Sequence, residues 1–323
     1  MRFLLKVFYN FLFGLWGFAY DFKRFIKYSG WRHSMRHSIV RNYYAAIVYH
    51  GLEKSLSFKN RNPKSGWDNA FRMLGIIELA SKKGEGGYHD KAGRNALEQF
   101  INLPENKGTN EAAHIRGALE EITFYSPDEH GVISFAELDY HKGLLASPED
   151  FFLSRYSLRE FKTGSVSGDV IDRAVKLAIK TPSVCNRRPW KVYHTDSSEV
   201  RDMVLSLQSG NRPFGKEIPN IMVVTTDLQA FFGHREHYQH WIDGGLFSMS
   251  LMYAFHSLGV AACALNWSQT PKNDRALRKL VNIDPHHTVI MMLAIGYPDK
   301  NNKVCASACP PLESVLLNLE KVK

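Results

Sequence analysis

The segment Ser154–Phe161 has residue types that can bind a phosphate-bearing ligand. It places two arginines and a hydroxyl within five residues, Arg155, Ser157 and Arg159. Guanidinium groups form paired, charge-assisted hydrogen bonds to phosphate oxygens and can also bond the polar edge of a ring. Because most such stretches are solvated surface, this segment becomes informative only in combination with others.

Three further segments could complete a site. Residues 181–190 are a proline-bounded loop after a helix, and this loop displays Ser183 and Asn186. Residues 258–267 have the pattern of an apolar strand that delivers its end to a site. Residues 294–298, Ala-Ile-Gly-Tyr-Pro, end the last strongly apolar strand.

Histidines and cysteines elsewhere offer weaker alternatives. His234, His237 and His240 stand three apart and could ligate a metal from one side of a helical turn. No cysteine or paired carboxylate nearby completes a ligand set, so we favour a polar helix start and expect no metal site. Cys305 and Cys309 lack the usual spacing of a redox pair, so we expect free thiols.

The elements that must position these segments follow from hydrophobic periodicity and turn residues. Helices are predicted over 29–58, 68–81, 88–103, 110–124, 167–180, 197–208, 238–258 and from Pro271 after a Thr270 cap. Strands are predicted over 190–195, 218–226, 260–266 and 288–295. Interleaved strands and helices without a glycine-rich βαβ fingerprint predict an α+β fold.

The domain organisation follows from the same change of pattern near residue 147. We expect an apolar and basic helix over residues 1–28, a mostly α-helical domain over 29–146, and a mixed domain over 147–323. A linker is predicted around 126–148.

Composition places the chain among packed, non-secreted proteins. Its 323 residues are 44% hydrophobic, which is ample for a core, and four cysteines are too few for a disulfide scaffold. We therefore expect a reducing, cytoplasmic location. Residues 1–64 contain twelve Lys/Arg against two Asp/Glu, so the net charge of +9 belongs to this segment. Such a segment implies an anionic neighbour: a membrane surface, a polyanion or an acidic face of the same protein.

Three placements remain open for the apolar residues 1–28. The helix could pack on the rest of the protein, which we favour. It could lie at a membrane interface, with Phe11, Leu15, Trp16, Phe18 and Phe22 in the headgroup region and Lys6, Lys23, Arg24 and Lys27 against anionic lipid. A membrane span or a signal peptide is the third and least favoured option. The apolar run 7–20 is shorter than a bilayer-spanning helix needs, and no suitable cleavage site follows.

In this order and spacing, the four segments resemble the FMN-dependent nitroreductase family. Its members open with Arg-x-Ser-x-Arg-x-Phe and continue, after one helix, with Pro-Ser-x-x-Asn-x-Gln-Pro-Trp. A Gly-Leu-Gly-like strand after a long helix and an Ile-Gly-Tyr-Pro strand end follow. The resemblance covers residues 147–323 and implies a three-layer α/β/α sandwich, an oxidoreductase, and a homodimer that holds FMN between its subunits.

The resemblance also implies roles for individual residues. Arg155 and Ser157 would hold the phosphate, and Arg159 would face the N1/O2 edge of the flavin, where a cation stabilises the reduced ring. The partner subunit would supply the 182–186 loop, and the main chain at 265–267 would lie beside N5. The implied cofactor-binding residues are Arg155, Tyr156, Ser157, Arg159, Pro182, Ser183, Asn186, Asn211, Leu265, Asn266, Trp267 and Lys303.

Two departures from the family pattern support an alternative function. Arg188 stands where the family has Gln, and Cys309 precedes the C-terminal Pro-Pro-Leu-Glu where a phosphate-binding basic residue is usual. Lys300 or Lys303 could replace that residue. If neither does, the protein would be a non-catalytic or weakly FMN-binding accessory protein at a membrane surface.

A segment of the helical half is similar to part of a nitroreductase subgroup. Residues 49–56, Tyr-His-Gly-Leu-Glu-Lys-Ser-Leu, resemble a Tyr-His-x-(Ile/Leu)-Glu-Lys-Gly-Leu segment found in proteins linked to surface-polysaccharide clusters. The resemblance implies a role in polysaccharide biosynthesis. We expect NAD(P)H as co-substrate, a small-molecule substrate, no nucleic-acid partner, and a location in the cytoplasm or at the inner membrane face.

Overall fold

The C-terminal part of the chain is built on a four-stranded antiparallel sheet with the order β1-β2-β4-β3. The structure is a computed structural model and describes residues 2–124 and 131–322. The strands are β1 (Trp190–Thr195), β2 (Asn220–Asp227), β3 (Ala261–Asn266) and β4 (His287–Gly296). The two central strands, β2 and β4, are largely buried on both faces, which explains their continuous apolar sequences.

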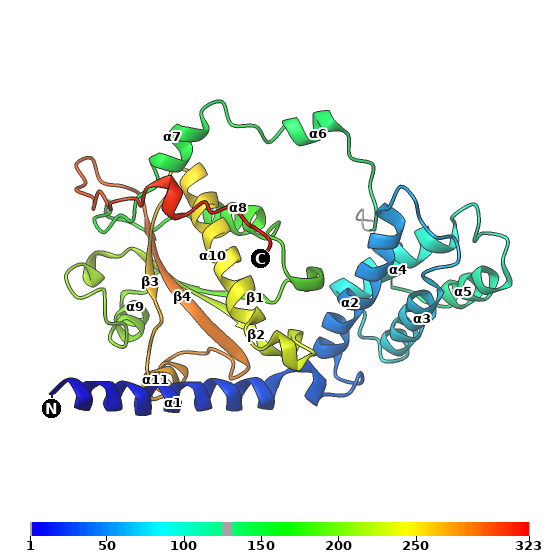
Figure 1. Cartoon of the computed structure of the whole chain (residues 1–323), viewed down its shortest axis with the longest axis horizontal. Coiled ribbons are helices and arrows are strands. Elements are labelled where there is room, and N and C mark those ends of the chain that lie inside the picture. Colours follow the sequence, from blue (N-terminus) through cyan, green and yellow to red (C-terminus); the bar gives the residue numbers. More distant parts are fainter. Residues whose placement is uncertain (1, 125–130, 323) are drawn as a thin grey trace.

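Helices cover both faces of this sheet and give three layers (Figure 1). The successive residues Met222 and Val223 of β2 enter opposite layers, as the period of two in a strand requires. Met222 belongs to the same buried apolar cluster as Phe247, whereas Val223 belongs to the cluster that contains Leu277. The covering helices are α8 (Gly168–Ala178) and α10 (Gln239–Ser257) on one face, and α9 (Ser198–Leu205) and α11 (Pro271–Leu280) on the other. The α+β class and the α/β/α sandwich expected from the sequence are therefore confirmed.

The N-terminal part is helical and has its own core. Tyr49, Ile77, Leu97 and Phe100 are at most 1% exposed and belong to one apolar cluster. Its helices are α2 (Ser38–Ser57), α3 (Trp67–Lys82), α4 (Tyr88–Ile101) and α5 (Asn110–Glu120). The connection to the sheet carries two short helices, α6 (Glu137–His141) and α7 (Pro148–Leu153), and passes over the top of the view in Figure 1.

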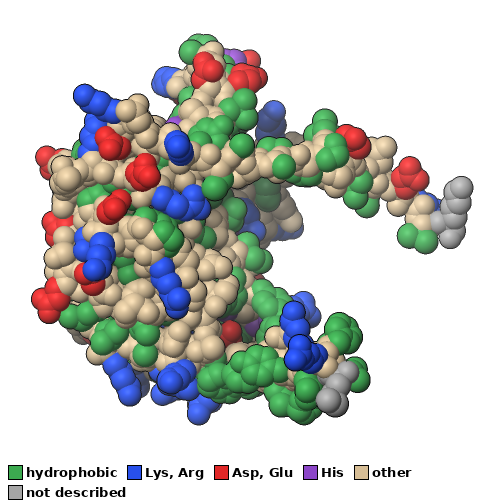
Figure 2. Space-filling model, turned by 90° about the vertical axis from the view of Figure 1, so that its left-hand side faces the viewer, with side chains coloured by type: hydrophobic (Ala, Val, Ile, Leu, Met, Phe, Trp, Pro, Cys, Tyr) green, Lys and Arg blue, Asp and Glu red, His purple; other side chains and the backbone are tan. Residues whose placement is uncertain are grey.

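Helix α1 (Arg2–Tyr28) differs between its two ends. Near its C-terminus, Arg24 donates to the carbonyl of His287 at 2.9 Å, and Phe25 is 4% exposed. The side chains from Phe3 to Phe18 remain exposed, and Figure 2 shows hydrophobic groups gathered around basic ones at the lower right. Among the described helices, α1 is the one whose length and apolarity would allow it to cross a membrane, a test that signal sequences and core helices also pass.

Several predicted boundaries need correction. The strand 190–195 has the predicted bounds, but the helix predicted over 29–58 begins only at Ser38. The reason is local: the short helix η1 (Gly30–Arg32) comes first, and the His37 ring then caps α2 by accepting from the Val40 N–H. The helix predicted over 110–124 ends at Glu120. The predicted linker contains α6, and its residues 126–130 lie outside the described residues.

Candidate functional site

The arginine segment lies against the edge strand of the sheet. Ser157 forms a parallel bridge with Ala262 of β3, and Phe161 forms an antiparallel bridge with Pro298. In an extended segment, alternate side chains share a face. The Arg-x-Ser-x-Arg spacing therefore puts Arg155, Ser157 and Arg159 on one side, along β3.

This side carries positive charge without a balancing anion. Among the described residues, no carboxylate lies within 4.0 Å of either arginine. The Arg159 guanidinium instead lies 6.0 Å from the centre of the Phe214 ring and 3.8 Å from the Cys305 sulfur. Both arginines also act on buried Cys263: burial raises the pKa of its thiol, and the two positive charges oppose that shift. A cavity of about 220 Å³ opens at Arg155, beside Tyr156 and the start of β3.

The end of β3 presents main chain more than side chain. Trp267 is buried and its indole donates to Asp274 at 3.1 Å, while the carbonyl of Asn266 accepts from Gln208. Asn211 is 6% exposed, and its amide donates to Leu205 and Gln208 carbonyls, so its observed role is to hold the 205–215 turn. Leu265 is buried in the core below. The flavin contacts expected of these residues stay predictions.

The C-terminal segment contacts Arg159. Cys305 contacts Arg159, and Lys303, two residues earlier, is exposed. Because successive residues of extended chain advance by about 3.3 Å, a lysine side chain at this position can reach the neighbourhood of Arg159. The structure therefore brings a thiol to the arginine side and leaves Lys303 nearby.

The loop between α8 and β1 has an unusual backbone. Cys185, Asn186 and Arg188 have φ values of 47°, 53° and 49°, in the left-handed region that non-glycine residues rarely adopt. Residues held in such conformations need a surrounding structure that fixes them, and they cluster at functional sites. The loop is therefore a second candidate half of a binding site.

Buried hydrogen bonds fix this loop. Asp243 at the start of α10 accepts from the Val184 N–H at 3.3 Å, and Ser183 Oγ accepts from the Arg188 N–H at 2.9 Å. Arg187 is 1% exposed and is paired with Glu236. The sequence did not reveal this pair, because its members lie far apart in the chain and belong to different elements. These bonds to Asp243, Ser183 and Glu236 thus fix the backbone of the loop that contains Pro182 and Asn186.

The loop and the arginine segment lie at opposite ends of α10. The loop is attached to Asp243, whereas Ser154 is hydrogen-bonded to His256 at 3.0 Å. These two helix residues are thirteen positions apart, which corresponds to about 20 Å at ~1.5 Å per residue. A single chain therefore does not bring the two half-sites together.

A different polar cluster lies in a cleft of about 1530 Å³ between the helical part and the sheet. It consists of Asp227, His286 and His287, whose ligand atoms all lie within 4.8 Å of one another. Burial and the neighbouring His286 lower the pKa of His287 to about 3. Sequence reasoning missed this cluster, because β2 and the start of β4 lie far apart in the chain.

His234, His237 and His240, which the sequence analysis considered as metal ligands, do not form a ligand set among the described residues. His234 and His237 are exposed near the short helix η5 (His234–Glu236), whereas His240 is buried in α10. Its ring stacks on Phe25 at 6.3 Å, and burial lowers its pKa to about 3. The helix begins only at Gln239, so the spacing of three does not place the rings on one side. The cysteines of the described chain, Cys305 and Cys309 included, are free.

Comparison with known proteins identifies the sheet-containing part. Residues 153–297 match the family model described as Nitroreductase family. A protein of Methanothermobacter thermautotrophicus, provisionally described as an NADH dehydrogenase/NAD(P)H nitroreductase, is 27% identical over 157 residues, which are 46% of this chain and 75% of that one. Iodotyrosine deiodinase of Hydra vulgaris is 23% identical over 209 residues, 55% of this chain and 75% of that protein.

Solved structures give matches of the same kind. An FMN-dependent nitroreductase of Clostridium difficile has a TM-score of 0.42 at 21% identity, with 48% of this chain and 90% of that chain covered. A nitroreductase-family protein of Streptococcus pneumoniae has a TM-score of 0.45 at 17% identity, with 52% and 98% covered. The aligned part of this chain is about half of its length in each case.

Proposed function

Because residues 153–297 belong to the nitroreductase family, we propose that this chain is an FMN-dependent oxidoreductase that takes electrons from NAD(P)H and delivers them to a small-molecule acceptor. The observation that carries the proposal is the pair Arg155 and Arg159 beside β3, two cations for which the described residues offer no carboxylate. Such a pair suits a phosphate and an electron-accepting ring that becomes anionic on reduction.

The residues present fit FMN. Arg155 and Ser157 would hold the phosphate, and Arg159, which extends toward Phe214, would face the N1/O2 edge of the ring. When bound, FMN supplies the redox chemistry by accepting a hydride at N5 and passing it on. The chain's own part is to orient the ring with the main chain at 265–267 and to stabilise negative charge with Arg159. Lys303 is proposed as a third cation in place of the residue that the family has before Pro-Leu-Glu.

A homodimer is part of this proposal. The loop with Ser183 and Asn186 lies about 20 Å along α10 from the arginine segment at ~1.5 Å per residue, so a partner's loop is needed to complete one flavin site. Leu316, Leu317 and Leu319 near the C-terminus are 69%, 75% and 102% exposed. An arm of exposed leucines needs a surface to cover it, and a second copy of the chain supplies one.

Arg159→Ala is expected to weaken FMN binding by roughly 10- to 100-fold, because a charge-assisted hydrogen bond contributes about 1.5–3 kcal/mol. It should also slow flavin reduction, since the charge opposite N1/O2 is lost. Titration of FMN fluorescence and stopped-flow reduction by NADH and NADPH measure these effects. Arg155→Ala should weaken binding with less effect on the reduction step.

Arg173→Ala, on the exposed side of α8, is the matched control and should bind FMN like the parent. If Arg155→Ala and Arg159→Ala retain the parent affinity while the fold is intact, the assignment of this segment to the flavin is wrong. The experiment thereby tests the observation on which the proposed function rests.

A second candidate is a membrane-surface accessory protein that keeps the fold with weak or no FMN binding. The exposed apolar part of α1 favours this second candidate. Its solvent-exposed aromatic and leucine side chains are flanked by Lys and Arg, and such a surface fits an anionic lipid membrane. We propose that α1 makes the protein peripheral at a membrane in either case. The polysaccharide role remains a proposal from the similarity of residues 49–56; in this structure Tyr49 and Leu52 of that segment pack in the helical core.

A further inference from the structure

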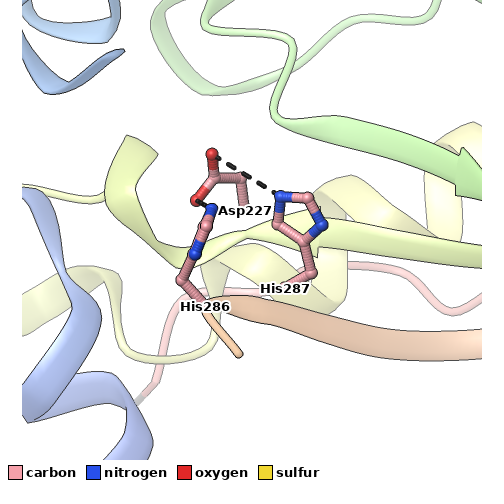
Figure 3. Close-up of side chains that lie close together, drawn as sticks. All are labelled: Asp227, His286 and His287. Carbon is pink, nitrogen blue, oxygen red and sulfur yellow. Dashed lines mark ion pairs between the residues drawn. The ribbon is translucent and has the colours of Figure 1, made fainter. Parts of the chain in front are cut away.

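Asp227, His286 and His287 meet at the cleft edge of the sheet. Asp227 ends β2 and is the register partner of His287, the first residue of β4. The turn before β4 is tied to β2 by a hydrogen bond from the Leu228 N–H to the His286 carbonyl at 3.0 Å. Both imidazoles consequently point at the same carboxylate, as Figure 3 shows. His286 Nε2 lies 3.9 Å from one carboxylate oxygen, and His287 Nε2 lies 3.9 Å from the other.

The hydrogen bonds behind His287 fix the orientation of its ring. Its Nδ1 lies 2.7 Å from the Tyr193 hydroxyl. That hydroxyl accepts from the Asp284 N–H at 3.2 Å and lies 3.5 Å from the Asp284 carboxylate, to which it can donate. Because the hydroxyl proton is directed to Asp284, the tyrosine oxygen accepts a hydrogen bond from Nδ1–H of His287. The Nε2 lone pair of His287 then faces Asp227. Metal-binding histidines usually donate a hydrogen bond from the ring nitrogen that does not bind the metal.

The carboxylate lacks a fixed cation. The Asp227 side chain is 2% exposed and accepts from the Gln229 N–H at 2.9 Å and from the Tyr43 hydroxyl at 3.2 Å. No Lys or Arg of the described residues lies within 4.0 Å of it. Burying a carboxylate without a counter-charge is costly. A lone pair and a carboxylate oxygen that face each other across 3.9 Å gain from a cation between them.

The spacing suits an ion at the centre of the cluster. Metal–nitrogen and metal–oxygen bonds of zinc are about 2.0–2.2 Å, so two ligand atoms of one ion lie at most about 4.4 Å apart. The two 3.9 Å separations fall within that limit. The other separations are at most 4.8 Å, so side-chain shifts of a few tenths of an ångström bring the whole set within it. Two imidazoles and one carboxylate suit zinc and similar divalent transition metals better than magnesium or calcium, which prefer oxygen.

We propose that Asp227, His286 and His287 bind one divalent transition-metal ion, with zinc as the expected occupant, and that its free coordination position faces the large cleft. Three protein ligands leave a fourth position for water or a ligand in a tetrahedral site. The cleft beside the cluster has a volume of about 1530 Å³, and Tyr43 of α2 and Lys191 of β1 are among the residues that line it. Arg187 and Arg188 of the loop between α8 and β1 also line this cleft, whereas Arg155 and Arg159 do not.

The experiment uses the full-length protein after removal of any histidine tag and treatment with a chelator. Calorimetric titration with ZnCl₂ should show one tight site per chain. Titration with CoCl₂ should give the visible absorption bands of four-coordinate cobalt. His286→Gln and Asp227→Asn should each lower zinc affinity by more than about 100-fold, beyond the ~10- to 100-fold typical of losing an outer hydrogen bond. Tyr193→Phe, which removes such a bond, should cost about 10- to 100-fold and shift the cobalt bands.

The double variant His234→Gln/His237→Gln is the control, because these histidines are exposed and outside the cluster. It should bind zinc as the parent does. Circular dichroism checks folding, and His286, whose side chain is 20% exposed, carries the test if Asp227→Asn fails to fold. The proposal is overturned if the parent has no stoichiometric site, if His286→Gln binds zinc equally well, or if binding is lost in the control.

Discussion

Arg187→Ala is expected to destabilise the protein by about 3 kcal/mol, near the lower end of the ~3–5 kcal/mol found when one member of a buried ion pair is removed. Arg187 is 1% exposed and bonds Glu236, the Val184 carbonyl and the Ala230 carbonyl. The Glu236 side chain is 24% exposed, so water can partly solvate it once the arginine is gone. Equilibrium unfolding in urea, followed by circular dichroism, measures the loss.

The loss of stability in Arg187→Ala should become smaller as the pH falls. Burial favours a raised pKa for Glu236, but the hydrogen bond and charge of Arg187, together with the bonds from the Phe232 and Gly233 N–H groups, outweigh it and hold that pKa below the usual 4.5. A carboxyl group with a lowered pKa stabilises the folded state above its unfolded pKa, and this contribution is lost as the pH falls through the folded value. The difference between Arg187→Ala and the parent should therefore be full at neutral pH and shrink below about pH 4.5.

Arg235→Ala is the matched control for this pair. Arg235 precedes Glu236 and is exposed, so its removal should change stability by no more than about 0.5 kcal/mol. Equal stability of the two variants would contradict the structural role given to Arg187. Because Arg187 holds the loop with Ser183 and Asn186, its loss should also weaken FMN binding.

A chain that begins at Tyr20 is expected to lose binding to vesicles with anionic lipid by more than about 1000-fold. Burial of one large apolar side chain contributes about 1.5–3 kcal/mol, so three inserted side chains already account for this factor. The deletion removes the exposed residues 3–18 and spares Arg24 and Phe25, which hold the end of α1 to the sheet domain. Vesicle sedimentation measures binding, and the melting temperature should stay within a few degrees.

The matched comparison is a chain that begins at Ser29, which also removes Arg24 and Phe25. It should melt lower than the chain that begins at Tyr20, because the Arg24 bonds to His287 and Asp274 are lost. High salt should release part of the bound full-length protein if α1 lies at the interface, since the attraction of Lys and Arg is screened within about 10 Å at 0.1 M. Absence of vesicle binding by the full-length chain would contradict the membrane proposal.

Local pattern predicted most of the elements. The β-branched run behind Pro219 and the apolar run 288–295 became the two central strands, β2 and β4, because strands covered on both faces need continuous apolar sequence. The Arg-x-Ser-x-Arg segment was selected by its residue types, and its place along β3 comes from the bridge between Ser157 and Ala262.

The features that could not be predicted from the sequence depend on contacts between residues far apart in the chain. The Asp227 cluster arises from the register of β2 with β4, and the Arg187–Glu236 pair joins a loop to the turn before α10. Spacing along the chain could not place the rings of His234, His237 and His240, because α10 begins only at Gln239. The exposure of the first part of α1 likewise depends on what the rest of the chain leaves uncovered.

We propose that two copies of this chain hold FMN in sites that both copies complete. The most direct test is size-exclusion chromatography of the full-length protein with added FMN, monitored by light scattering and by flavin absorbance. We expect one species of twice the 36.9 kDa chain mass that carries the flavin band and loses it when NADH or NADPH is added without oxygen. A monomer that retains FMN, or a dimer that elutes free of flavin, would contradict the account.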